Sequence, residues 1–292
     1  GNITFTDEVG TTIRDFQPAE LSLDAGFSQR FTDKFSGGVA GRFVHSNLTG
    51  GVSVLGADSK PGISVAADVS MFYTNDQANW GGKDGTFNFG VNISNIGSKM
   101  SYTTTALRDF IPANLRLGVA YKMNLDDYNA LTFTIDGNKL LVPTTPQYSQ
   151  INSTNILSGY PSDVGVATAI IQSFYDAPGT GTAFVDPDTN EEYWEGDKGS
   201  IFREEMREIN LGGGIEYDFA EVFAFRAGYF YEHWSKGNRQ FITMGAGMKY
   251  TVFTIDLSYV ISTTQLSPLA NTLRFTLRMQ FSDLADASQS EN

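Results

Sequence analysis

The sequence predicts an all-β protein, a transmembrane antiparallel up-and-down β-barrel of the outer-membrane type. Three observations predict it: long segments with a period of two, charged residues on only one side of those segments, and aromatic residues at their ends. Composition agrees, because charged residues make up 18% of the chain, below the roughly 25% usual for soluble domains. Aromatic residues reach 13%, which suits strands that face an apolar medium.

Alternation of apolar and polar residues defines the strands. Near the C-terminus, Leu273, Phe275 and Leu277 alternate with Arg274 and Thr276, a pattern typical of a strand with one apolar face. Most such segments approach the 9 to 11 residues that a tilted strand needs to cross a bilayer. We therefore expect about twelve strands, at residues 2–6, 20–31, 35–47, 63–73, 86–96, 113–123, 130–141, 207–218, 223–233, 241–251, 253–262 and 272–281.

Charge placement separates the two faces of these strands. A Lys or Arg that faces lipid at mid-membrane costs roughly 2–4 kcal/mol, whereas one that faces the lumen need not. We expect no charge to interrupt the apolar side, and ion pairs to fill the interior. The alternative is a soluble sandwich or lipocalin-like fold, but the charged faces are rich in small residues and sparse in Lys and Glu. The predicted interior ions are Asp24, Asp68, Glu216, Asp256, Arg42, Arg226, Arg274 and Arg278.

Aromatic residues gather where strands meet one rim, as the interfacial girdles of membrane barrels do. Connections at this rim are short, except for residues 74–85, and those at the other rim are longer, at 7–19, 48–62 and 97–112. This asymmetry predicts periplasmic turns and extracellular loops. The girdle residues are Phe31, Tyr73, Tyr121, Tyr217, Tyr250, Phe281, Phe35, Phe87, Phe223 and Phe253.

The longest connection, residues 142–206, is an extracellular loop that should carry local structure or function, because bare loops of this length are uncommon. Ser162 or Asp163 could cap a short helix through Val166, Ile170 and Phe174, and residues 200–207 could form another. Exposed Tyr193 and Trp194 are residue types that anchor protein partners.

Several function classes are disfavoured. A net charge of -13 and a pI near 4.5 argue against nucleic acid as a partner. The chain has no cysteine, no helix-spanning run of about 18 apolar residues, and no nucleophile, zinc or phosphate-loop motif. Gly212, Gly213 and Gly214 lie within a strand, where glycine more often marks a bend or close packing than a phosphate site. We expect no enzyme activity and no cofactor.

Metal binding has one weak candidate. Asp186, Asp188 and Asn190 place oxygen atoms at alternate positions, as a calcium loop does, but Glu191 stands where such a loop needs Gly. A solvated acidic turn is the favoured interpretation, and we expect no metal. His45 and His233 lack the spacing of a metal site.

Three segments carry a family resemblance: residues 92–97 (NISNIG), 110–118 (FIPANLRLG) and 226–229 (RAGY). They resemble the PorV family of the Bacteroidetes type IX secretion system, which is related to the FadL transporters. The resemblance implies a FadL-like barrel of 14 strands, so that two N-terminal strands and the lumen plug would be missing here. On this basis residues 1–281 form the barrel, including the extracellular loop 142–206, and residues 282–292 form a periplasmic polar tail.

The resemblance also implies a function. It implies a non-catalytic outer-membrane component that binds the C-terminal signal domains of secreted cargo beside the large translocon channel, in contact with outer-membrane lipid. The cargo then passes to a sortase-like surface attachment protein. The alternative is a FadL-type transporter of hydrophobic small molecules; an open porin is disfavoured. Topology alone suggests the partner-binding candidates Phe174, Tyr175, Tyr193, Trp194, His233 and Trp234.

Overall fold

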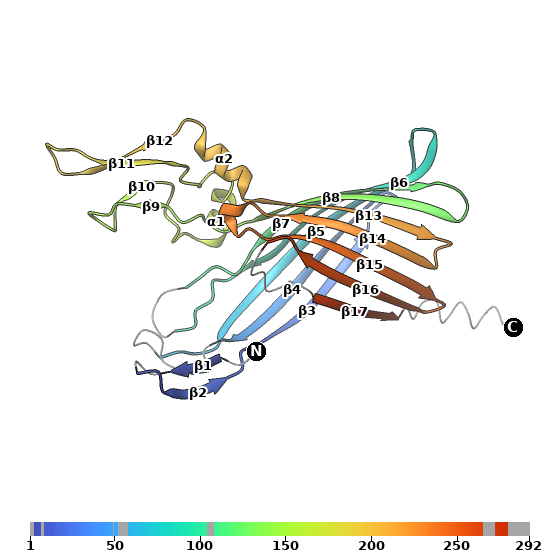
Figure 1. The fold of residues 1–292 in the computed structure, drawn as a ribbon, viewed down its shortest axis with the longest axis horizontal. Helices are drawn as coiled ribbons and strands as arrows, with labels where there is room; N and C mark the ends of the chain where they lie inside the picture. The colour runs from blue at the N-terminus through green and yellow to red at the C-terminus, as the bar shows by residue number, and fades with distance from the viewer. Residues whose placement is uncertain are drawn as a thin grey trace.

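The computed structural model describes residues 3–6, 9–48, 50–51, 58–103, 108–264 and 272–279. One antiparallel sheet of eleven strands dominates it, in the order β17-β16-β15-β14-β13-β8-β7-β6-β5-β4-β3 (Figure 1). The all-β, up-and-down prediction is therefore confirmed. The strands are β3 (Ala19–Arg30), β4 (Phe35–Asn47), β5 (Gly62–Trp80), β6 (Lys83–Gly97), β7 (Asn114–Asn124), β8 (Asn129–Leu140), β13 (Ile209–Phe219), β14 (Phe223–Tyr231), β15 (Gln240–Tyr250), β16 (Phe253–Ser262) and β17 (Thr272–Met279).

The predicted first strand does not join this sheet. Instead β1 (Ile3–Thr6) pairs with β2 (Thr12–Phe16) in a separate two-stranded sheet. The predicted loop 7–19 was therefore wrong in part, since it contains β2. The turn at Val9 and Gly10 explains the difference, because Gly10 adopts a positive φ of 85° and returns the chain on itself.

The connection predicted at residues 74–85 is also wrong. The two strands continue past the predicted rim, and Trp80 pairs with Lys83 across a two-residue turn. Gly81 and Gly82 have φ values of 62° and 77°, which suit a tight hairpin whose twist matches its strands. The polar sequence TNDQAN concealed the strand, because this hairpin extends beyond the apolar band.

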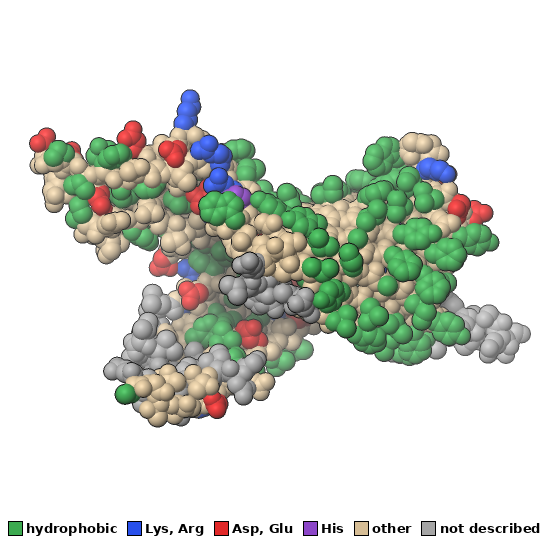
Figure 2. Space-filling model, viewed as in Figure 1, with side chains coloured by type: hydrophobic (Ala, Val, Ile, Leu, Met, Phe, Trp, Pro, Cys, Tyr) green, Lys and Arg blue, Asp and Glu red, His purple; other side chains and the backbone are tan. Residues whose placement is uncertain are grey.

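Apolar side chains cover one face of the sheet (Figure 2). Leu23, Val65, Ile135, Phe225 and Leu277 all lie on it and are exposed. The predicted girdle is present at one rim for the residues that the structure describes: Phe31 lies 6.2 Å from Phe35, and Tyr73 lies 6.4 Å from Phe87, between ring centroids. Phe281 lies outside the described residues.

The opposite face carries the predicted ion pairs. Arg42 bonds to Asp24 and Asp68, and Arg226 bonds to Glu216 and Asp256. Arg278 reaches Asp256 at 4.0 Å. Arg42 thus links carboxylates on the two strands beside it, β3 and β5, and Arg226 links β13 to β16 across β15, which confirms ion pairing on this face.

A β-bulge lies within residues 92–97, one of the three segments that carry the family resemblance. The register of β5 and β6 shifts between Ala67 and Val69, and Asn95 takes a positive φ of 59°. Its backbone N–H donates to Asp68 at 2.7 Å, and its side-chain amide donates to the Pro112 carbonyl at 3.0 Å. Residues 92–97 and 110–118 are therefore joined by a side-chain contact.

One charged residue breaks the predicted rule for the apolar side. Lys139 pairs with Leu115 of β7 and Ile209 of β13, so it shares the apolar face with them. The prediction failed there because a segment distant in sequence supplies carboxylates that cover this ammonium group.

Strands β3 and β17 form the edges of the sheet within the described residues. Residues 282–292, predicted as a polar tail, lie outside them. Among the described residues, none of the helices has the length and apolar character needed to cross a membrane.

Candidate functional site

A folded insertion, residues 141–208, connects β8 to β13 and is called the loop module below. It contains β9 (Gln147–Tyr148), β10 (Ile156–Ser158), α1 (Val166–Gln172), β11 (Gly181–Val185), β12 (Glu192–Gly196) and α2 (Ser200–Arg207). The module lies at one end of the sheet, and its β11–β12 hairpin points away from the strands (Figure 1). The prediction that this connection carries local structure is confirmed.

Both predicted helices form, but their caps differ from the prediction. Helix α2 begins after Gly199, whose φ of 70° turns the chain into the helix. Helix α1 begins after Gly165, and neither Ser162 nor Asp163 caps it. The N-cap position is Gly165, where the chain is still extended. Ser162 and Asp163 come before this position, from which a side chain can accept the first free N–H groups of the helix.

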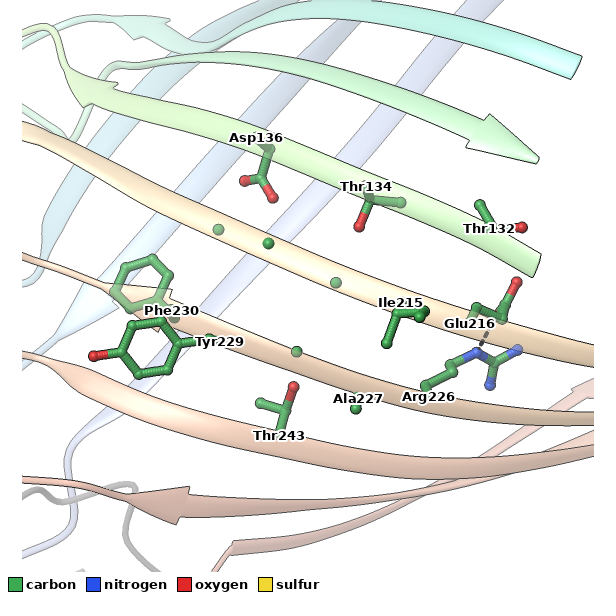
Figure 3. A pocket seen from close by; sticks show the side chains of 14 residues that line it. Thr132, Thr134, Asp136, Ile215, Glu216, Arg226, Ala227, Tyr229, Phe230 and Thr243 are labelled. Carbon is green, nitrogen blue, oxygen red and sulfur yellow. Dashed lines mark hydrogen bonds and ion pairs between the residues drawn. The ribbon is translucent and has the colours of Figure 1, made fainter. Parts of the chain in front are cut away.

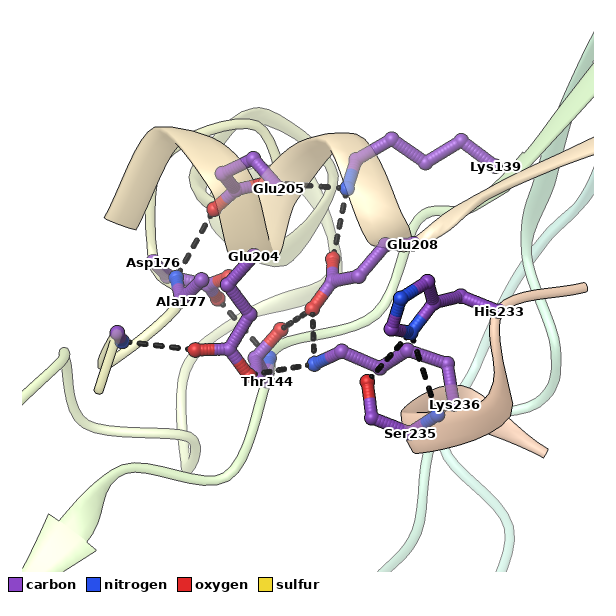
Figure 4. Close-up of polar contacts among 11 residues, drawn as sticks. Lys139, Thr144, Asp176, Ala177, Glu204, Glu205, Glu208, His233, Ser235 and Lys236 are labelled. Carbon is purple, nitrogen blue, oxygen red and sulfur yellow. Dashed lines mark hydrogen bonds and ion pairs between the residues drawn. The ribbon is translucent and has the colours of Figure 1, made fainter. Parts of the chain in front are cut away.

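A nearly buried ion network fastens α2 to the sheet (Figure 4). The Lys139 ammonium group lies 3.1 Å from Glu205 and 2.7 Å from Glu208. Glu205 also accepts the backbone N–H of Ala177 at 2.9 Å. Because the Lys139 side chain is only 8% exposed, these carboxylates replace nearly all of its water.

The network continues to the short helix η1 (Trp234–Lys236). Lys236 donates to Glu204 at 2.7 Å and to Glu208 at 2.9 Å. Burial opposes ionisation of Glu208, but the bonds from both lysines outweigh it and hold the pKa of Glu208 below its usual value. Burial likewise opposes charge on Lys236, and its bonds to Glu204 and Glu208 raise its pKa.

Asp176 is a second buried carboxyl group in the loop module. It accepts the Thr144 backbone N–H at 3.1 Å and the Gln172 side-chain amide at 3.3 Å. Burial raises the pKa of Asp176 despite these bonds. The segment that leaves β8 is therefore tied to α1 by this one side chain.

A cavity of about 570 Å³ lies between α2, β12 and the end of α1. Three predicted partner-binding residues, Phe174, Tyr175 and Trp194, line it together. Ile201, Phe202 and Met206 of α2 complete its apolar wall. The structure thus brings half of the predicted site residues to one cavity, and α2 contributes residues that the sequence analysis did not select.

The other three predicted residues lie elsewhere. Tyr193 stacks on Phe184 at 5.8 Å, on the hairpin face opposite Trp194. His233 caps η1, where its ring nitrogen accepts the Ser235 backbone N–H at 3.2 Å. Trp234 is 70% exposed and lies 5.4 Å from the His233 ring. These residues share the module's end of the molecule but do not line the 570 Å³ cavity that Trp194 lines.

The Asp186 side chain closes the hairpin turn. It accepts the backbone N–H groups of Asp188 and Thr189 at 2.8 and 3.3 Å. The predicted acidic turn has the hydrogen bonds of an ordinary Asx turn. Among the described residues, no group of three or more His, Asp or Glu is placed to hold a metal ion.

A second cavity, of about 400 Å³, lies on the polar face of β8, β13, β14 and β15 (Figure 3). Asp136, Glu216, Arg226 and Thr243 surround it, and Gly212–Gly214 form its floor. A Cβ on Gly212 would lie 2.5 Å from the Asp136 carboxylate and one on Gly214 2.9 Å from the Thr134 hydroxyl, so these two glycines permit close packing, as predicted. Glu216 and Arg226 form an ion pair at this cavity, and Ile215, Ala227 and Phe230 also line it.

Comparison with known proteins gives the family. The family model described as "Type IX secretion system protein PorV" matches residues 1–147. This match covers half of the chain. The chain belongs to the PorV family. Membership makes this PorV-family chain a component of a type IX secretion system.

The other comparisons add less. The structure of the Ralstonia pickettii toluene transporter TbuX has a TM-score of 0.39 and 10% sequence identity, over 90% of this chain and 69% of TbuX. So low a TM-score carries no argument about fold or function. No curated protein matches the chain. The PorV match ends at residue 147, so nearly all of the loop module, with its cavity, lies beyond it.

Proposed function

We propose that this PorV-family protein is an outer-membrane β-barrel that binds the C-terminal signal domains of secreted proteins at the translocon and delivers them to a sortase-like attachment protein. The chain itself is non-catalytic in this proposal. Family membership is the observation that carries it. The apolar outer face, the ion-paired inner face and the aromatic girdle support insertion in a membrane.

The loop module supports a role in protein binding. Its cavity is lined by Tyr175 and Trp194, residue types that dominate binding energy at protein interfaces, together with aliphatic side chains. The ion network of Lys139 and Lys236 holds that cavity in a fixed position above the sheet. A preformed cavity reduces the ordering that a partner must impose.

The same cavity favours a second candidate, a FadL-type transporter of hydrophobic small molecules. At about 570 Å³ it lies within the size range of small-molecule sites. Further into the interior, however, the ion pairs of Arg42 and of Arg226, the latter at the cavity of Figure 3, would oppose passage of an apolar molecule.

Affinity purification from native outer membranes separates the two candidates. The secretion proposal expects secreted proteins with C-terminal signal domains to copurify with the chain. Recovery of lipid or hydrocarbon without such proteins would support transport and contradict the proposal.

Substitution of Trp194 tests the site. Trp194→Ala should reduce capture of signal domains by about tenfold, because a buried aromatic anchor commonly contributes 1–2 kcal/mol or more. Trp80→Ala serves as the matched control, since Trp80 is exposed and lies at the end of β5, outside the cavity. Unchanged capture by Trp194→Ala would remove the cavity from the binding site.

A further inference from the structure

The β11–β12 hairpin has a free strand edge. Strand β11 pairs only with β12 among the described residues, in a sheet of two strands. Residues Thr182, Ala183, Phe184 and Val185 of β11 are exposed. Strand edges of this kind present unpaired backbone groups, and natural proteins usually protect them with charge, proline or a cover. Strand β11 itself carries none of these devices.

The hydrogen-bond pattern identifies which backbone groups are free. Asp186 donates its N–H to Glu191, and Asp197 donates its N–H to Thr180. In an antiparallel ladder, every second residue pair exchanges backbone hydrogen bonds. The backbone N–H and C=O groups of Phe184 and Thr182 therefore also point toward β12. The N–H and C=O groups of Ala183 and Val185 therefore point to the free edge.

The two faces of the hairpin differ in accessibility. Trp194 lines the cavity of the loop module, and Glu192 accepts the backbone N–H of Gln150 at 2.7 Å, so their face lies against the module. On the other face, Phe184 and Tyr193 stack and are 42% and 52% exposed. A strand added beside β11 would extend this aromatic face.

The charge of the hairpin defines its partner. Residues 181–197 contain no Lys, Arg or His, and they contain the carboxylates Asp186, Asp188, Glu191, Glu192, Glu195 and Asp197. Acidic side chains lie near the hairpin tip and along its length, and red atoms mark this end of the molecule in Figure 2. Such a surface attracts a positively charged segment and repels an acidic one.

We propose that β11 is a docking edge for an extended, Lys- or Arg-bearing strand of a secreted protein's C-terminal signal domain, which joins the hairpin as a third strand. This inference rests on the proposed function and names the surface that carries it out. Backbone bonds to Ala183 and Val185 supply affinity, the Phe184–Tyr193 face supplies apolar contact, and Glu191 and Glu195 select basic side chains.

Proline at position 183 tests the edge. Ala183→Pro removes the outward N–H without removing a bond to β12, and proline is tolerated at such edge positions. Ala183→Val is the matched control, because it adds bulk but keeps the N–H. The protein, purified in detergent, is tested against a purified C-terminal signal domain by biolayer interferometry, and circular dichroism checks the fold of each variant.

We expect Ala183→Pro to weaken binding at least tenfold and Ala183→Val to bind as the unsubstituted protein does. Equal binding by the Pro and Val variants, whether strong or weak, would overturn strand addition at β11. Absence of binding by the unsubstituted protein would instead contradict the proposed function, and the inference with it.

Charge reversal provides a test that does not depend on proline. Glu195→Lys should weaken binding and reduce its sensitivity to salt, since one attraction is replaced by repulsion. Asp127→Lys in the β7–β8 turn is the control, because Asp127 is also exposed but lies away from the loop module. Equal effects of the two reversals would show a response to net charge alone and would overturn the hairpin as the docking surface.

Discussion

The two ion-paired regions of this molecule hold charge in different ways. On the polar face of the sheet, the Arg226 side chain is 42% exposed and bridges Glu216 and Asp256. In the loop module, the Lys139 side chain is 8% exposed and its partners Glu205 and Glu208 are almost as deeply buried. Water can replace a lost partner in the first region but not in the second. The sheet therefore tolerates changes in its charges, whereas the loop module depends on each of its ions.

Removal of Lys139 should have the largest effect. Lys139→Met keeps the aliphatic stem but leaves Glu205 without its cation and Glu208 with Lys236 alone, and breaking a buried ion pair in this way costs roughly 3–5 kcal/mol. Hydrogen exchange of the amides of α1 and α2 measures the free energy of module opening. The double substitution Lys139→Met with Glu205→Gln should recover part of it. Unchanged protection in Lys139→Met would contradict the difference between the two regions.

Acidification should have an intermediate effect on the loop module. The pKa of Glu208 is lowered in the folded protein, so its contribution to stability is present above the unfolded value of 4.5 and is lost as pH falls through the folded value. Asp176 acts in the opposite sense, because its raised pKa makes its protonation favour the folded module.

Fluorescence of Trp194 follows this transition in a Trp80→Phe, Trp234→Phe background. We expect its emission to move to longer wavelength as pH falls from 4.5 toward the lowered pKa of Glu208, where this carboxylate takes up a proton. In the same background, the Trp194 emission of Glu208→Gln should lie at the longer wavelength already at neutral pH. A transition of equal size in Glu208→Gln would exclude Glu208 as its cause.

Removal of Arg226 should have the smallest effect. Arg226→Met leaves Glu216 and Asp256 partly solvated, and exposed ion pairs contribute about 1 kcal/mol or less. Hydrogen exchange of β14 and β15 amides gives the measurement, with Lys139→Met as the comparison. A loss as large as that of Lys139→Met would show that the sheet interior is as dry as the loop module.

The sequence predicted the sheet better than the loop module for a physical reason. Each strand carries its own alternation, so the boundaries of β4, 35–47, follow from local sequence alone. The network of Lys139 instead joins residues more than 60 positions apart, which no local period records. Its one signal was Lys139 itself, an ammonium group on the apolar side of its strand that required a partner.

The candidate site was predictable in part for the same reason. Phe174, Tyr175 and Trp194 were selectable as exposed aromatics on the long connection. The participation of Ile201, Phe202 and Met206 depends on how α2 packs against β12 and the end of α1. The separation of Tyr193 from Trp194 follows from the alternation of β12, which became evident only when its pairing with β11 was known.

The β5–β6 hairpin and the β11–β12 hairpin project from opposite ends of the molecule (Figure 1). Since the chain contains no cysteine, a thiol introduced by Asn79→Cys or by Thr189→Cys is the only one in its variant. An impermeant maleimide applied to whole cells would then report which hairpin is outside. The molecule thus carries two separate attachment points for determining its orientation, and no other cysteine of this chain competes for the label.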